Sequence, residues 1–71
     1  MIVRDIFFGM GIDSPATFAA MRAKEDLYAN IKQDIGDTEY TVVSFETKIL
    51  DQEDSPYEVI IIAVIDINKI N

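Results

Sequence analysis

The run from Glu58 to Asp66 restricts the fold of this chain more than any other segment, because every residue between its two acidic ends is apolar. Successive side chains of a strand point to opposite faces. A strand here is therefore apolar on both faces, one with Val59, Ile61, Ala63 and Ile65 and the other with Ile60, Ile62 and Val64. Such a strand belongs in the middle of a sheet that is covered on both sides.

The segment before it predicts one helix, beginning after Ser14 and ending near Ile35. Ser14 is a good N-cap, Pro15 is tolerated in a first turn, and Gly36 readily adopts the left-handed conformation that ends helices. The apolar stripe of this helix comprises Ala16, Ala20, Ala23, Leu27 and Ile31, widened by Met21, Tyr28 and Ile35, while Arg22, Glu25, Asp26, Asn30 and Gln33 lie opposite. The stripe predicts that one helix face packs on the sheet, and its alanines predict a close approach.

Two further strands are expected, from Ile2 to Phe8 and from Glu39 to Leu50, beside the apolar strand from Tyr57 to Ile67. Gly9 and Gly11 are interpreted as ending the first strand and releasing the chain toward the helix. The second strand alternates between Thr41, Val43, Phe45, Thr47 and Ile49 on one face and Tyr40, Val42, Ser44, Glu46 and Lys48 on the other.

These elements predict an α+β fold in the order β-α-β-β, as a single domain spanning residues 1–71. Placing the apolar strand in the middle gives a three-stranded antiparallel sheet of order 1-3-2, with the helix on one face. The other face then needs cover from outside the protomer. A chain of 71 residues has a small core, and the absence of cysteine and histidine removes the usual disulfide and zinc supplements. We therefore expect a homo-oligomer whose interface contains Ile60, Ile62, Val64, Val42 and Tyr40.

Composition excludes several classes of function. Thirteen acidic against six basic residues give a net charge of -7, which disfavours binding to nucleic acids or to anionic membranes. The first residues lack the pattern of a secretory signal, and no apolar run approaches the length of a membrane helix, so a cytoplasmic protein is expected. Without histidine or cysteine, and with no paired catalytic groups, the chain is not expected to be an enzyme or to carry a cofactor or a metal.

One acidic cluster leaves its interpretation open. Asp51, Glu53 and Asp54 fall in the expected hairpin loop, at the same end of the domain as Asp13. Carboxylates that converge hold Ca²⁺ or Mg²⁺, whereas carboxylates that do not converge form an ordinary solvated turn. The spacing does not match an EF-hand loop.

Binding is the leading functional interpretation. Lys24 falls inside the apolar stripe of the helix, near Arg22 and Tyr28, where an ammonium group can meet an anionic ligand. These features favour a non-catalytic module that sequesters a small ligand between subunits or docks on a partner protein; its size and acidity are also those of accessory proteins of phages and mobile elements. An alternative is an acidic inhibitor that mimics nucleic acid toward a DNA- or RNA-binding protein.

The predicted layout is also similar to that of the dodecin family of small flavin-storing proteins. That resemblance implies an oligomer that covers the free sheet face and stores a cofactor. Dodecins stack the flavin on a tryptophan of the second strand. This chain has no tryptophan, so the resemblance implies Phe45 or Tyr40 in that role.

Overall fold

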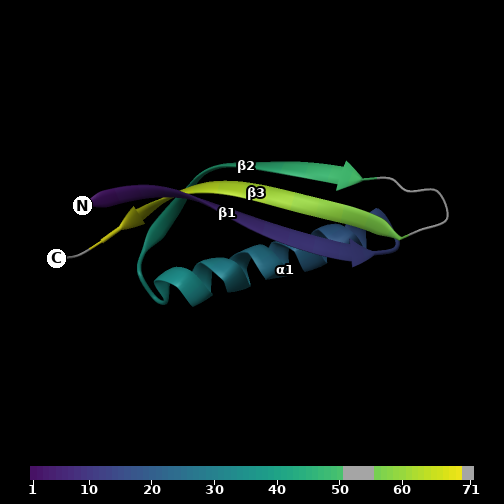
Figure 1. The fold of residues 1–71 in the computed structure, drawn as a ribbon, viewed down its shortest axis with the longest axis horizontal. Helices are drawn as coiled ribbons and strands as arrows, with labels where there is room; N and C mark the ends of the chain where they lie inside the picture. Colours follow the sequence, from purple (N-terminus) through teal and green to yellow (C-terminus); the bar gives the residue numbers. More distant parts are fainter. Residues whose placement is uncertain (51–55, 70–71) are drawn as a thin grey trace.

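The computed structural model describes residues 1–50 and 56–69 of the chain. Three antiparallel strands form one sheet in the order β1-β3-β2, and a single helix lies on one of its faces (Figure 1). The elements are β1 (Ile2–Asp13), α1 (Ala16–Ile35), β2 (Tyr40–Leu50) and β3 (Tyr57–Asn68). The α+β class, the element order and the sheet order expected from the sequence are confirmed.

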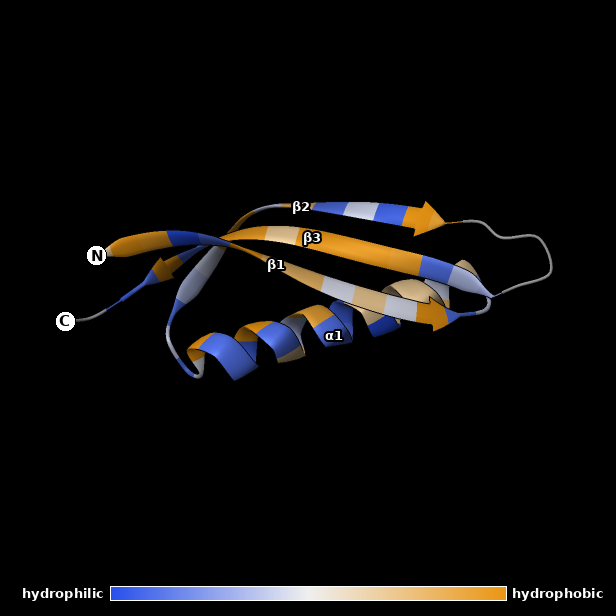
Figure 2. Ribbon diagram, viewed as in Figure 1, coloured by the Kyte–Doolittle hydropathy of each residue, from blue (hydrophilic) through white to orange (hydrophobic). Residues whose placement is uncertain are grey.

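The central strand β3 has two apolar faces, as its sequence predicts, and Figure 2 shows it as almost continuously hydrophobic. Its helix-side residues are buried: Val59, Ile61, Ala63, Ile65 and Ile67. With Phe7 of β1 and four residues of α1 (Ala19, Ala23, Leu27 and Ile31) they form the hydrophobic core. On the opposite face Ile60, Ile62 and Val64 are only half-buried. The core therefore lies entirely between the sheet and the helix.

Gly9 and Gly11 do not end the first strand, which continues to Asp13. Both glycines face α1, which passes so close that a Cβ atom on Gly9 would lie 2.2 Å from the carbonyl oxygen of Ala23. A Cβ atom on Gly11 would lie equally close to the carbonyl oxygen of Ala19. The expected strand break is therefore wrong. These glycines leave room for the helix backbone, and the buried alanines complete the close contact.

The helix ends as predicted but begins differently. Gly36 has φ of 62°, and its N–H donates to the carbonyl of Lys32 at 2.8 Å, which terminates the helix. At the other end the N-cap residue is Pro15, and no side chain caps the first turn. The expected Ser14 cap is wrong because the helix begins one residue later, so that Pro15 takes the cap position and Ser14 lies before it.

A β-bulge in β2 changes the faces expected for that strand. Val42 pairs with Ile65 of β3, but the next paired residue is Ser44, opposite Val64, so Val43 is the extra residue. Tyr40 and Val42 consequently share the helix-side face with Phe45, and Tyr40 packs against the core. The prediction that they share a face with Ile60, Ile62 and Val64 is wrong, because alternation along the sequence does not reveal the bulge.

Candidate functional site

The helix does not lie over the middle of the sheet. It packs against β1 and β3, while β2 pairs with β3 on the side away from β1 (Figure 1). Close contact at Gly9 and Gly11 holds α1 on the β1 side. The helix-side face of β2 is therefore left uncovered by α1, and a groove runs between α1 and β2.

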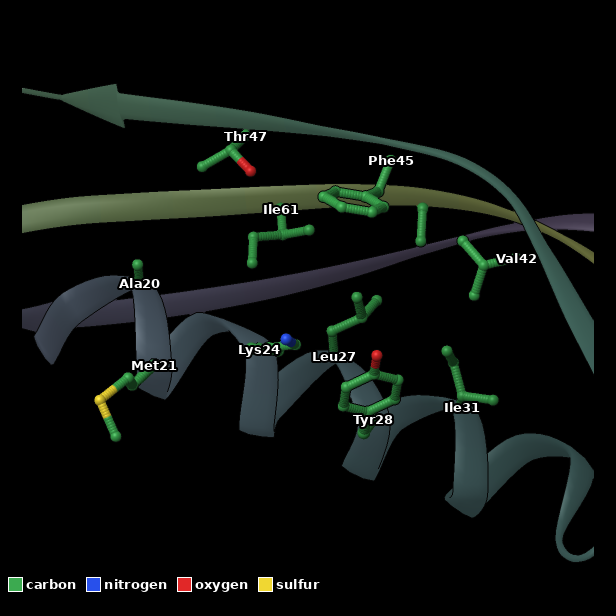
Figure 3. A pocket seen from close by; sticks show the side chains of 11 residues that line it. Ala20, Met21, Lys24, Leu27, Tyr28, Ile31, Val42, Phe45, Thr47 and Ile61 are labelled. Atoms are coloured by element: carbon green, nitrogen blue, oxygen red, sulfur yellow. The ribbon is translucent and has the colours of Figure 1, made fainter. Parts of the chain in front are cut away.

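This groove, which we call the α1–β2 groove, encloses about 470 Å³. That is the size of a small-molecule site. Figure 3 shows its walls, with side chains rising from α1 and facing those of β2 across the gap. The helix contributes Ala20, Met21, Lys24, Leu27, Tyr28 and Ile31, β2 contributes Val42, Phe45 and Thr47, and β3 forms the floor with Ile61 and Ala63.

Most of the lining is apolar, and its polar groups are few. Lys24 and Tyr28 stand one helical turn apart on the exposed side of α1, and the Tyr28 hydroxyl points toward the sheet (Figure 3). Thr47 supplies a hydroxyl from β2. The Phe45 side chain is 69% exposed, so an apolar ring faces solvent from the opposite wall. The α1–β2 groove thus combines apolar walls with one cationic group, the ammonium group of Lys24.

Of the three residues predicted to bind a ligand, the structure brings Lys24 and Tyr28 together in the groove. Arg22 lies apart from them. Its Nε donates to Asp13 Oδ2 at 2.6 Å, which ties α1 to the end of β1. Phe45, a groove residue, appears in the sequence only as a candidate for cofactor stacking. Its place in the groove depends on the off-centre helix, which leaves the helix-side face of β2 uncovered.

Two ion pairs shift the titration of their carboxylates. The hydrogen bond from Arg22, with one from the Ser14 backbone N–H, holds the pKa of Asp13 below its ordinary value. Arg4 donates two hydrogen bonds to Asp66 across the sheet and lowers the pKa of Asp66 in the same way. Among residues 1–50 and 56–69, both ion pairs involve a residue of β1.

The sheet face away from the helix, here called the outer face, carries a second apolar surface. Directly opposed apolar pairs run along it, namely Ile6 with Val64, Phe8 with Ile62 and Met10 with Ile60. The β1 members are well exposed, and Phe8 is 57% exposed. The patch continues through Ile12 at one end, and the Arg4–Asp66 pair closes it at the other. On β2 this face is polar, with Ser44, Glu46 and Lys48.

No helix in the described part of the chain is long and apolar enough to cross a membrane. Within the same residues, no three carboxylates come together as a metal site would require. Asp51, Glu53 and Asp54 lie outside the described residues, while Asp13 is paired with Arg22.

Comparisons with protein-family models, with curated proteins and with solved structures find nothing that matches this chain. Its function must therefore be argued from the geometry of the α1–β2 groove and the outer face.

Proposed function

We propose that this protein is a non-catalytic binding module that associates through its outer face and holds a small amphiphilic anion in the α1–β2 groove. The observation that carries the proposal is the groove itself, an apolar trough with a single ammonium group on its rim. Ligand sites of this kind combine mostly apolar walls with few polar groups that fix orientation.

The chemistry of the walls selects the class of ligand. An alkyl chain or a small ring lying against Leu27, Phe45 and Ile61 removes apolar surface from water on both sides. Lys24 then offers a charge-assisted hydrogen bond to a carboxylate, and the Tyr28 hydroxyl a neutral one. A medium-chain carboxylate has both an alkyl chain that the apolar walls can bury and an anionic group that Lys24 can bind.

Self-association is supported by the outer face. A continuous apolar patch of this kind marks an interaction surface in soluble proteins. A second copy presents the same patch, which is complementary to itself across a two-fold axis and brings no charge to its centre.

Titration with decanoate and with decanol tests the ligand. Both should bind, and decanoate more tightly, because only decanoate engages the ammonium group of Lys24. Lys24→Gln should weaken decanoate about tenfold and leave decanol unchanged, the loss expected for one charge-assisted hydrogen bond. Lys32→Gln is the matched control, since Lys32 is exposed on the same helix and lies outside the groove lining. Absence of binding by both probes, or equal affinities in Lys24→Gln and wild type, contradicts the proposal.

Sedimentation tests the association. The wild type should sediment above the 8.0 kDa of one chain at micromolar concentration. Ile62→Glu places a charge in the outer face and should lower the sedimenting mass, while circular dichroism shows the fold retained. Phe18→Glu, at an exposed aromatic residue of α1, is the control and should leave the mass unchanged. A wild type that sediments as a single chain refutes association through this face.

A second candidate, storage of a flat aromatic cofactor, has one observation in its favour. The exposed Phe45 ring stands in the groove wall, where it offers a stacking surface. Quenching of flavin mononucleotide fluorescence by the wild type, lost in Phe45→Ala, supports this candidate. A groove that binds decanoate and leaves flavin fluorescence unchanged excludes it.

A further inference from the structure

The two edge strands of the sheet differ in whether side chains hydrogen-bond the backbone groups on their free edges. Along β1 side chains occupy one outward backbone group each at Ile6, Phe8 and Met10: the Met10 N–H donates to Asp26 Oδ2 at 2.9 Å, and Asn30 Nδ2 donates to the Phe8 carbonyl at 2.8 Å. The Ile6 N–H donates to the side chain of Asp5. Occupied groups of this kind cannot pair with another strand. The β1 edge is therefore partly blocked, with one outward group occupied at each of Ile6, Phe8 and Met10.

Within residues 1–50 and 56–69, no hydrogen bond occupies the outward backbone groups of β2. The Asn68 N–H donates to Glu39 and the Lys69 N–H to Met1, so even-numbered residues of β3 bond toward β2 and odd-numbered ones toward β1. Beyond the bulge, the β2 residues opposite even-numbered β3 residues are Ser44, Glu46 and Lys48. The backbone groups of Phe45, Thr47 and Ile49 therefore point out of the sheet.

We propose that two copies pair their β2 strands edge to edge, antiparallel, about a two-fold axis at Thr47. Thr47 then lies opposite Thr47 of the second copy, and Phe45 lies opposite Ile49 of the second copy. These are the residues whose backbone groups face outward, so they form the hydrogen-bonded pairs. Aromatic with β-branched residues, and threonine with threonine, are favourable cross-strand neighbours.

Charge selects this register. On the outer face it places Glu46 opposite Lys48 of the second copy, and the two-fold axis makes this contact twice. A shift of the axis toward Glu46 sets Glu46 against Glu46, and a shift toward Lys48 sets Lys48 against Lys48. Like charges directly opposite each other destabilise a strand pair. A larger shift toward the start of β2 carries the pairing across the bulge at Val43, where the ladder is interrupted.

The pairing joins two protomers into one continuous sheet with both helices on the same face. It removes the open edge, and it places the two α1–β2 grooves side by side with the paired β2 strands between them. Ile49 of the second copy lies beside Phe45 there, so each groove gains an apolar residue from its partner. The pairing does not depend on what the groove binds or on contacts of the outer face.

Single cysteine substitutions test which residues lie opposite each other in the dimer, because the chain has no cysteine of its own that could form other disulfides. The Cα atoms of a hydrogen-bonded pair are ~5.5 Å apart, within the range that a disulfide spans. Thr47→Cys should therefore give a covalent dimer on mild oxidation. Glu46→Cys and Lys48→Cys are the controls. In this register neither residue lies opposite the same residue of the second copy, so neither variant should form a covalent dimer. A dimer formed at Glu46→Cys or Lys48→Cys in place of Thr47→Cys, or at none of the three, overturns the proposal.

Two further sets of variants separate this interface from the outer face. Glu46→Lys and Lys48→Glu should each weaken dimerisation about tenfold, and the double variant should restore it, because the opposite charges are then exchanged. Thr47→Pro removes an outward N–H without breaking the β2–β3 ladder, and it should abolish the edge dimer. Phe8→Glu puts a charge into the outer face on β1, away from Glu46, and should leave the Thr47→Cys crosslink intact. A crosslink lost in Phe8→Glu, or a double charge variant as weak as the singles, refutes edge pairing while leaving ligand binding untouched.

Discussion

The two edges of the sheet are built in opposite ways, although β1 and β2 both pair with β3. On the β1 side, Gly9 and Gly11 admit the helix backbone, and Asp26 and Asn30 of α1 bond the free edge. On the β2 side, every residue from Thr41 to Leu50 is exposed. The α1–β2 groove is therefore a consequence of helix packing at the opposite edge, because a helix held against β1 cannot also cover β2.

The largest expected effect comes from breaking the close contact on β1. Gly9→Ala places a Cβ atom 2.2 Å from the Ala23 carbonyl oxygen and 2.5 Å from the Leu27 nitrogen, and both are helix backbone atoms that cannot move alone. We expect a loss of about 3 kcal/mol or more in the free energy of unfolding, measured by chemical denaturation. The displaced helix should also narrow the α1–β2 groove and weaken decanoate binding.

Gly36→Ala is the matched control for that variant. Gly36 has a positive φ but no atom near its missing Cβ, so only backbone strain opposes the alanine. Because ψ is -130°, outside the left-handed helical region, a cost of about 2 kcal/mol is expected there. Equal stability losses at Gly9 and Gly36 would show that the helix can shift freely over β1, against the contact described above.

The same glycines mark the limit of what the sequence could predict. The apolar run of β3 was sufficient to predict the sheet order, because only a central strand buries both faces. The sequence predicts a strand end at Gly9, since it does not show that a helix backbone lies against this residue. Lys24 and Tyr28 were predicted as ligand residues from the helical stripe. Phe45 and Val42 could not be placed beside them, because both placements require the off-centre helix and that of Val42 also requires the bulge.

A smaller effect is expected from opening the β1 edge. Asn30→Ala removes the hydrogen bond to the Phe8 carbonyl and should cost about 1 kcal/mol, a typical net value when water can replace the lost partner. Its free edge should also make the variant associate more strongly with rising concentration, which light scattering detects. Gln33→Ala, at an exposed position one turn away, should change neither quantity. Unchanged association in Asn30→Ala would mean that this bond does not protect the edge.

The ion pairs of β1 predict a dependence of stability on pH. The folded pKa values of Asp13 and Asp66 are lowered by their arginine partners, so the stability they contribute is complete above the ordinary aspartate pKa, ~4. It is lost as the pH falls through the lower pKa of the folded protein. The unfolding midpoint of Asp13→Asn should therefore decrease less than that of the wild type as the pH falls below about 4. Asp37→Asn, in the exposed turn after α1, should leave the slope unchanged; equal slopes in Asp13→Asn and wild type would contradict the pairing.

The smallest effect on stability is expected from truncating a phenylalanine on β2. Phe7 and Phe45 lie on the helix-side face of opposite edge strands, 9% and 69% exposed respectively. Phe7→Ala should cost about 3 kcal/mol or more, whereas Phe45→Ala should stay within about 0.5 kcal/mol in dilute protein. Repeating the denaturation at rising protein concentration sharpens the comparison. A Phe45→Ala penalty that grows with concentration means that copies bury this ring between them, whereas a constant small penalty leaves it facing solvent in the groove.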